Sequence, residues 1–483
     1  MKAVMEYLGS ILRSFSFFLL LPAVIAFIMG EDASLFLVSF IIALGVSFFL
    51  RRIAKELGTA QDKLFTFKSI SLTQGFVIAA LSFLVLPLFG MVPYIPHFEG
   101  PAPKILVDSY FEAVSGITTT GLSVVQDPGS LPVSLLIWRS LSQWVGGIGI
   151  VIVFLFIIYK IRSESNVDAK KSGASSIRLF HSLISGTADV DMTTIIRHML
   201  IIYIGLTLFA FIGFLMTGLS FFQAVNLSFT SVSTGGFIPG QQFPDATPVL
   251  IFTMVVMFLG AISFIAYDSL FTGGIRKFFQ DIELRSLVIV LILLAFVGLI
   301  IPLGDTGYLQ ALFEMTSALT GTGYSASFIP SLPQAIIFLI LGGMLMGGST
   351  CSTSGGLKQF RIVILIRAFF WRVKRLTYPT SAIIPFKFRK SPIGQETLLM
   401  IHILIAGFMM LIYLGTFLFL VYGYPLLDAI FQLIPPLCTV GLTTISIAAL
   451  PPGAKIVAIA LMLLGRLEIY PLFVLVRVLF RKG

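Results

Sequence analysis

Ten apolar stretches, most of them long enough to cross a bilayer, constrain the fold of this 483-residue chain more than any other feature. A spanning helix needs roughly 20 mainly apolar residues to cover the hydrocarbon core. Only 11% of the residues are charged, whereas soluble domains carry about a quarter. The sequence therefore predicts an all-α polytopic membrane protein rather than an ordinary soluble enzyme. The stretches are residues 11–30, 34–50, 69–92, 133–159, 196–219, 247–271, 285–303, 333–372, 397–421 and 453–477.

The net charge of +10 is distributed unevenly between alternate loops. Basic residues gather around 51–68, 160–178, 276–285, 358–390 and 477–482. The loops at 93–131, 218–246, 304–332 and 422–452 hold only Lys104 among their basic residues, together with eight acids. Because basic residues concentrate in cytoplasmic loops, both termini are expected in the cytoplasm. The positive charge is then topological, no nucleic-acid partner is expected, and the acidic outer face would concentrate cations.

The four acidic outer loops contain an internal repeat. Each begins with an apolar stretch too short to span and then breaks at glycine among Ser and Thr. Aligned on Gly121, Gly235, Gly323 and Gly441, the residue nine positions earlier is polar in every copy. The copies read SYFEAVSGITTTGLSV (109–124), FFQAVNLSFTSVSTGGF (221–237), YLQALFEMTSALTGTGYS (308–325) and PLLDAIFQLIPPLCTVGLTT (425–444).

Each unit predicts a helix, a short re-entrant helix, a glycine-containing turn and a second helix. Irregular backbone at membrane depth is tolerated only where protein buries it or where it lines a watery cavity. Four such turns around one axis could replace the hydration shell of a monovalent cation with carbonyl oxygens. Glycine suits the turn because it adopts positive φ without strain. A single copy would instead favour an ordinary glycine-rich outer turn beside an interfacial helix, but four aligned copies favour the pore.

The chain resembles the Trk/Ktr/HKT superfamily of potassium transporters, and most of all its TrkH branch. Besides the four turns, the resemblance rests on WRSLSQWVGGIGIVIV (138–153), GGSTCSTSGGLK (347–358) and LMLLGRLEIYPL (461–472). It implies two extra N-terminal transmembrane helices followed by four potassium-channel-like repeats around one pore. The corresponding divisions are residues 1–68 for the extra helices and their loop, then 69–192, 193–282, 283–394 and 395–483 for the repeats.

The resemblance also implies which residues bind potassium. Glycine at all four filter positions favours potassium, since some plant members with serine in the first repeat carry sodium. The neighbouring residues depart from the TVGYG of ordinary potassium channels, so weaker exclusion of sodium is expected. The candidate filter residues are Thr119, Thr120, Gly121, Ser233, Thr234, Gly235, Gly321, Thr322, Gly323, Thr439, Val440 and Gly441.

The eighth apolar stretch is too long for one span and contains a polar break at residues 347–356. Glycine, Ser and Thr disfavour helix there, which predicts an intramembrane loop below the third turn. The alternatives are a flexible kink or a small-residue helix contact. In TrkH-like proteins the matching loop obstructs the pore, so the expected gate is Gly347, Gly348, Ser349, Thr350, Cys351, Ser352, Thr353, Ser354, Gly355 and Gly356.

Arg466 lies midway along the last apolar stretch, where a charge is costly unless it faces a cavity or a partner. Pairing with Glu468 is disfavoured because residues two apart on a helix do not face each other. We therefore expect Arg466 in the conduction path, as in TrkH relatives. For Arg139 we expect a structural role, with Glu112 as a possible partner.

For the other charged residues, the histidines and the cysteines, we expect structural roles rather than roles in transport or metal binding. Asp268 is expected at a membrane boundary, and three cations are expected to snorkel there: Arg197, His198 and Lys358. The four histidines lack metal-ligand spacing, and the two cysteines, Cys351 and Cys438, read as small apolar fillers. No cofactor is expected within this chain, where the potassium ion is the substrate and the filter its only metal site.

The resemblance implies a homodimer in a bacterial inner membrane, contacting lipid, with a TrkA-like nucleotide-binding cytosolic ring. No cytoplasmic stretch is long enough to form a nucleotide-binding domain, so nucleotide control would come from that partner. Potassium uptake is the leading hypothesis. A proton- or sodium-coupled transporter is the alternative, disfavoured because no carboxylate pair is visible at mid-span. A membrane enzyme would need clustered catalytic side chains, and none is visible.

Overall fold

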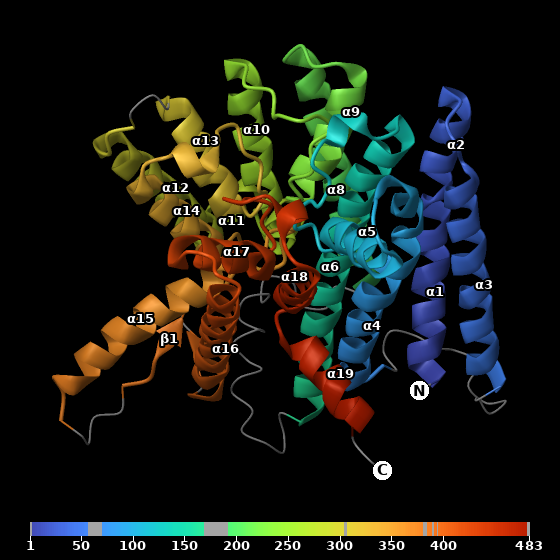
Figure 1. The fold of residues 1–483 in the computed structure, drawn as a ribbon. Coiled ribbons are helices and arrows are strands. Elements are labelled where there is room, and N and C mark those ends of the chain that lie inside the picture. The colour runs from blue at the N-terminus through green and yellow to red at the C-terminus, as the bar shows by residue number, and fades with distance from the viewer. Residues whose placement is uncertain are drawn as a thin grey trace.

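The computed structural model describes residues 2–56, 70–168, 192–303, 307–379, 384–388, 391–393 and 395–480. Nearly all regular structure within these ranges is helical, which confirms the predicted fold class (Figure 1). The exception is a short antiparallel ribbon of β1 (Lys387–Phe388) and β2 (Ser391–Pro392).

Three N-terminal helices precede the first repeat and lie together at one edge of the molecule (Figure 1). They are α1 (Lys2–Phe18), α2 (Leu20–Met29) and α3 (Ser34–Glu56). Together α1 and α2 make one span, residues Lys2–Met29, so the first predicted stretch begins earlier than residue 11. The two spans match the predicted pair of extra helices.

Four groups of helices follow, each with a short helix between two longer ones. The first is α4 (Leu72–Gly90), η2 (Val92–His97), α5 (Ala102–Ile117), η3 (Pro128–Ser130) and α6 (Val133–Asp168). The second is α8 (Met192–Met216), α9 (Phe221–Val232), α10 (Thr247–Gly260) and α11 (Phe264–Phe279). The third is α12 (Ile282–Ile300), α13 (Tyr308–Thr320), η4 (Ile329–Ser331), α14 (Gln334–Met346) and α15 (Gln359–Leu376). The fourth is α16 (Gln395–Val421), α17 (Leu426–Cys438), η5 (Ile447–Ala449), α18 (Pro452–Arg466) and α19 (Tyr470–Phe480).

Local sequence explains where several of these helices begin. Ser71 accepts a hydrogen bond of 3.2 Å from the backbone of Gln74, whose side chain accepts one from the Ser71 backbone at 2.9 Å. Ser220 and Gln223 form the same capping box at the start of α9. These caps satisfy backbone donors that have no partner in the first turn of a helix.

Two of the predicted apolar stretches are sharply bent. The helices α10 and α11 meet at 82°, and α18 and α19 meet at 106°. The apolar stretches at 247–271 and 453–477 are therefore each divided into two helices. Among the described residues, seven helices are long and apolar enough to span a membrane, or nine if each bent pair counts as one span. The eighth predicted stretch breaks between Met346 and Gln359, where the sequence predicted a loop.

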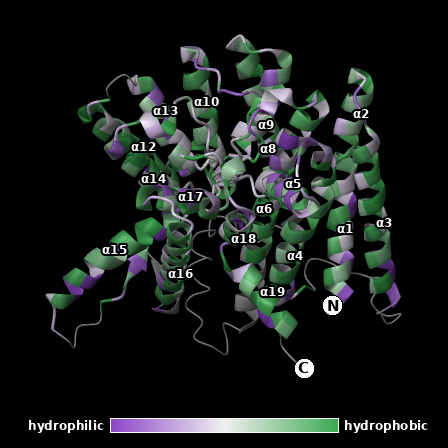
Figure 2. Ribbon diagram, viewed as in Figure 1, coloured by the Kyte–Doolittle hydropathy of each residue, from purple (hydrophilic) through white to green (hydrophobic). Residues whose placement is uncertain are grey.

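The distribution of polar and apolar side chains suits a membrane protein, with apolar residues on the outer surface and hydroxyl-bearing residues in the interior. Figure 2 shows apolar residues along most of the outer helices, and side chains such as Phe27, Met216 and Phe338 are 74–84% exposed. By contrast, Thr119 and Ser233 near the centre are fully buried. Exposed apolar surface on this scale indicates contact with lipid. The beginning of α1 and the end of α19 lie at the same end of the molecule (Figure 1).

Candidate functional site

Each short helix, α5, α9, α13 and α17, ends in a turn of the same backbone shape. We name these the first turn (118–122), the second turn (233–237), the third turn (320–324) and the fourth turn (438–442). In each, the residue just after the helix or its cap adopts positive φ: Thr119 (52°), Thr234 (49°), Gly321 (73°) and Thr439 (51°). Three of these are threonine, for which that conformation is uncommon. Strained backbone of this kind gathers at functional sites.

A glycine follows two residues later, and in three turns its φ is also positive. These are Gly121 (81°), Gly236 (83°) and Gly323 (84°). The second turn thus places Gly236 where the sequence alignment placed Gly235. Counting nine residues back from Gly236 reaches Leu227, so Asn226 is not the counterpart of the polar residue in the other copies.

The four turns lie against one another in a ring. A Cβ added to Gly121 would overlap the carbonyl oxygen of Gly235, and one added to Gly236 would overlap backbone atoms of the third turn. A Cβ on Gly323 would overlap the backbone nitrogen of Gly441, whose own Cβ would lie 3.1 Å from the carbonyl oxygen of Gly121. The contacts run from the first turn through the second, third and fourth and return to the first, so the four turns surround one axis.

Buried polar side chains hold the first turn from behind. Glu112 accepts hydrogen bonds from Ser123 Oγ at 2.9 Å and from the Val124 backbone at 3.1 Å. Arg139 Nη2 lies 2.8 Å from the Glu112 carboxylate, and both side chains are almost fully buried. The expected structural pair of Arg139 and Glu112 is confirmed.

A glutamate holds the third turn in the same way, and a glutamine at the matching position holds the fourth. Glu314 accepts from the backbones of Ala326 and Ser327 at 2.8 and 2.9 Å, and Gln432 bonds Thr443 at 3.1 Å. The second turn is supported from the first repeat instead. Gln143 on α6 donates to the carbonyl oxygen of Gly235 at 2.6 Å and accepts from the Phe237 backbone at 3.2 Å.

A buried ion pair closes the ring between the fourth and first repeats. Lys455 Nζ at the beginning of α18 lies 2.6 Å from Asp108 Oδ1 on α5. Their side chains are 2% and 6% exposed. The partners are 347 residues apart, so the contact ties the last repeat to the first. A buried pair of this kind is costly to break by removing one member.

The break after α14 forms a loop, residues 347–358, that packs under the ring. A Cβ on Gly321 would lie 2.8 Å from Ser354 Oγ, and one on Gly355 would lie 2.8 Å from the carbonyl carbon of Cys438. Thr234 Oγ1 donates to Thr353 Oγ1 at 3.3 Å. The 347–358 loop therefore contacts the second, third and fourth turns.

The same loop is anchored to its surroundings by backbone bonds. The Ser349 backbone donates to the carbonyl of Ala261 at 3.0 Å, and the Phe264 backbone donates to that of Cys351 at 3.0 Å. Both contacts use groups at the bend between α10 and α11. Thr350 donates its backbone N–H to Glu283 on α12. The loop is thus held by the second repeat as well as by its own.

Arg466 is the last residue of α18 and contacts this loop directly. Its Nη1 donates to the carbonyl oxygen of Thr353 at 2.6 Å, and the residue is 3% exposed. Glu468 pairs with Arg361 (Nη1 to Oε1, 3.2 Å) and not with Arg466. The two residues do not share a helix, because α18 ends at Arg466 and Glu468 lies in the bend with a φ of 55°.

A family model described as TrkH, cation transport protein, matches residues 47–483. The chain belongs to the TrkH family. An uncharacterized cation transporter of Methanocaldococcus jannaschii is 29% identical, over all of this chain and 96% of that protein. The Trk system potassium uptake protein TrkH of Halomonas elongata is 28% identical, over 98% of each. The crystal structure of the potassium transporter TrkH from Vibrio parahaemolyticus has the same fold, with a TM-score of 0.83, 23% identity and coverage of 100% and 99%.

Within this TrkH-family chain, several predicted positions need correction or lie elsewhere. Lys358 does not snorkel: it is 2% exposed, and its Nζ donates to the carbonyl of Ser354. His198 lies 2.8 Å from Asp268, while Arg197 is exposed. Both cysteines are buried and free. Among the described residues no cluster of three His, Cys, Asp or Glu side chains could hold a metal ion. The predicted basic positions at 63, 68, 170–178, 390 and 481–482, and Asp305, lie outside the described residues.

Sequence reasoning missed two supporting residues, Gln143 and Lys455. Gln143 gives no repeat signal, because it lies on α6, outside the aligned segment 109–124 of the first copy. Lys455 was counted as part of the apolar stretch at 453–477. A single cation near the end of a span can nevertheless indicate a buried ion pair when another outer segment carries an acid. The partner of Lys455, Asp108, was seen only as one of the outer acids.

Proposed function

We propose that this protein takes up potassium across the membrane through the ring of four turns. The observation that carries the proposal is the mutual contact of those turns, in which the carbonyl oxygens of Gly121 and Gly323 both lie beside Gly441 of the fourth turn. Such oxygens can replace the hydration shell of a dehydrated monovalent cation. The named potassium transporters of the TrkH family support potassium as the ion.

The candidate filter comprises the twelve residues predicted from the repeat, together with Gly236. All twelve lie in or beside the four turns. Because the residues flanking the glycines differ from repeat to repeat, we expect potassium to be preferred without complete exclusion of sodium.

The test is ion flux in proteoliposomes of the full-length protein, with potassium and sodium compared under the same gradients. Flux that saturates and follows the potassium electrochemical gradient alone supports the proposal. Flux that requires an imposed proton or sodium gradient supports a coupled transporter instead. Reversal potentials under bi-ionic conditions measure the preference, and a value showing equal permeability would contradict a potassium filter.

Coupling to protons is the second candidate, and one contact favours it. Glu283 is 7% exposed and accepts a hydrogen bond from the loop residue Thr350. Protonation of that carboxylate would remove a charge from beneath the loop. Flux that keeps its size when an imposed proton gradient is reversed would exclude this alternative.

Residues 347–356 of the 347–358 loop are the proposed gate, with Arg466 as a positive barrier beside them. The support is the position of the loop under three of the turns and its bond to Arg466 through Thr353. Opening requires the loop to leave this position. Deleting residues 348–354 should raise the flux of a well-folded protein, and unchanged or lower flux would count against the gate.

We further propose that both termini are cytoplasmic and that the protein is a homodimer controlled by a TrkA-like nucleotide-binding ring. The beginning of α1 and the end of α19 lie at one end of the molecule, as does the outer part of α15 with its basic residues (Figure 1). The relatives named as parts of a Trk system support a regulatory partner. Co-purification with such a partner, and its effect on flux with and without nucleotide, tests this assignment.

A further inference from the structure

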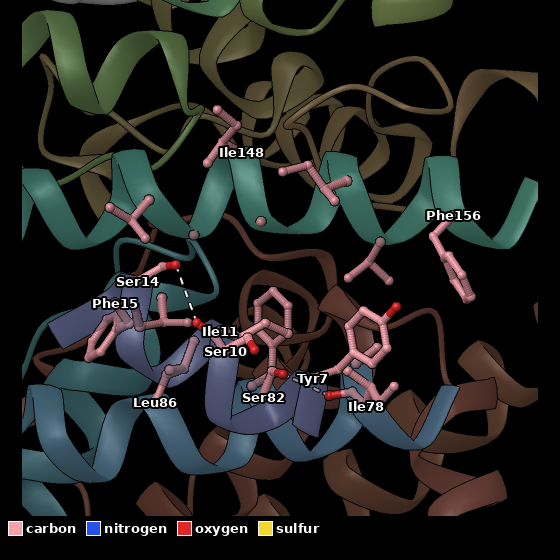
Figure 3. A pocket seen from close by; sticks show the side chains of 18 of the residues that line it. Tyr7, Ser10, Ile11, Ser14, Phe15, Ile78, Ser82, Leu86, Ile148 and Phe156 are labelled. Atoms are coloured by element: carbon pink, nitrogen blue, oxygen red, sulfur yellow. Dashed lines mark hydrogen bonds between the residues drawn. The ribbon is translucent and has the colours of Figure 1, made fainter. Parts of the chain in front are cut away.

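A cavity of about 440 Å³ lies between α1, α4 and α6, behind the first turn. Figure 3 shows α6 along one side of it and α1 and α4 along the other. Its walls are mostly aliphatic and aromatic side chains, among them Phe15, Ile78 and Phe156. The volume is within the range of pockets that bind organic ligands.

The three serine hydroxyls in the cavity do not require water. The hydroxyls of Ser10, Ser14 and Ser82 each donate to the backbone carbonyl four residues earlier in their own helix, at 2.9, 3.2 and 2.7 Å. Their hydrogen-bonding donors are therefore already used. Apolar cavities without such demands stay dry and take apolar guests.

The cavity opens on the lipid-facing surface. Ser14 lines it and is exposed, and Phe17, three residues further along α1, is 55% exposed. On the opposite wall, Gly149 of α6 is half-buried, and a Cβ there would meet nothing within 4 Å. Because exposed apolar surface of this kind contacts the bilayer, lipid acyl chains are the apolar molecules available at this opening.

The inner end of the cavity reaches the base of the first turn. Ile117, the last residue of α5, lines the cavity and directly precedes that turn. On the neighbouring wall, a Cβ on Gly146 would lie 2.7 Å from the carbonyl carbon of Ile117, so α6 packs directly on this residue. An occupant at this depth contacts the backbone segment from which the first turn begins.

We propose that this cavity binds one acyl chain of a membrane phospholipid. The chain enters between α1 and α6 and extends inward to Ile117. The binding itself is independent of which ion the protein carries, so failure of potassium uptake would leave it standing.

The experiment uses the full-length protein in nanodiscs whose phospholipid carries a photoactivatable diazirine midway along one acyl chain. After illumination, adducts are mapped by peptide mass spectrometry. We expect enriched labelling at residues 7–18 and 145–156, relative to the exposed face of α16. Gly149→Leu should lower this labelling by about tenfold, which corresponds to displacing about two methylenes at roughly 0.8 kcal/mol each.

Gly205→Leu on α8 is the matched control, because Gly205 is also a helical glycine with nothing within 4 Å of an added Cβ. It does not line the cavity, so labelling should stay at the wild-type level. Ser14→Phe fills the cavity from the opposite wall and should lower the labelling in the same way. It replaces Gly149→Leu in the experiment if Gly149→Leu folds poorly. The proposal is overturned if the cavity residues are labelled no more strongly than the exposed face of α16. It is also overturned if neither filling variant lowers the labelling.

Discussion

Arg466 Nη1 donates a hydrogen bond of 2.6 Å to the backbone carbonyl oxygen of Thr353, which joins the end of α18 to the loop beneath the four turns. The Nε and Nη2 atoms of Arg466 have no hydrogen-bond partner in the described part of the chain. Nor does a carboxylate pair with it there, since Glu468 binds Arg361. A buried guanidinium with spare donors therefore combines two effects in the proposed gate: it holds the loop by one bond and leaves a positive charge beside the loop.

Replacing Arg466 with Gln should increase potassium flux, because both the bond to Thr353 and the positive charge are removed. Lowering the barrier by about 1.4 kcal/mol corresponds to roughly a tenfold increase. The measurement is potassium flux in proteoliposomes, with Arg466→Lys as a control that keeps the charge. Flux of a well-folded Arg466→Gln protein at or below the wild-type level would contradict a barrier at this residue.

Gly236→Ala should reduce potassium flux and lower the melting temperature. Gly236 has a φ of 83°, and a Cβ there would overlap the backbone of the third turn. Left-handed backbone costs an L-residue about 1–2 kcal/mol before the overlap is counted. Gly240→Ala is the matched control, because its φ is not positive and an added Cβ has only one neighbour, at 3.8 Å. Equal effects of the two substitutions would sink the assignment of Gly236 to the ring.

The four turns and the 347–358 loop could be predicted because they depend on local chemistry. Glycine among Ser and Thr interrupts a helix wherever it occurs, and four copies of one pattern reveal a repeat. The second turn was placed one residue off because two adjacent glycines, Gly235 and Gly236, both satisfy the pattern. Only the backbone shape distinguishes them.

The two bends could not be predicted because tertiary contacts stabilise them. At the end of α18, Glu468 and Ile469 adopt φ of 55° and 68° without a glycine to relieve the strain, and Glu468 is held by Arg361. At the end of α10, the backbones of Ala261 and Phe264 bond the 347–358 loop. The sequence of either stretch does not indicate these contacts, because the partner residues are distant in sequence.

Lys455→Met should destabilise the protein strongly, because it leaves the carboxylate of Asp108 buried without its cation. Removing one member of a buried pair costs about 3–5 kcal/mol, whereas replacing both by apolar residues is often close to neutral. The double variant Lys455→Met with Asp108→Leu should therefore recover most of the lost melting temperature. The single variant Asp108→Leu completes the comparison. If the loss of stability in the double variant equals the sum of the losses in the two single variants, the two sites do not interact.

The pH dependence of stability should include a contribution from Glu31, which lies in the turn between α2 and α3. Its carboxylate accepts hydrogen bonds from the backbones of Val133 and Ser134, at 2.7 and 2.9 Å, in the first turn of α6. Partial burial acts to raise the pKa of Glu31, but the bonds from Ser134 and Val133 outweigh it and the pKa is lowered. The stabilisation is therefore complete above the ordinary carboxyl pKa of about 4.3 and is lost as the pH falls through the lowered value.

Glu31→Gln keeps an acceptor oxygen but removes the charge, so it isolates this contribution. At neutral pH the variant should melt about 1 °C lower than the wild type, since a carboxylate at a helix N-terminus contributes roughly 0.3–1 kcal/mol. Below the lowered pKa the wild-type residue is protonated, and the two melting temperatures should converge. Because the charge interaction is screened, added salt should narrow the gap at neutral pH as well. A gap that stays constant from neutral pH to strongly acidic pH would show that the charge of Glu31 does not stabilise α6.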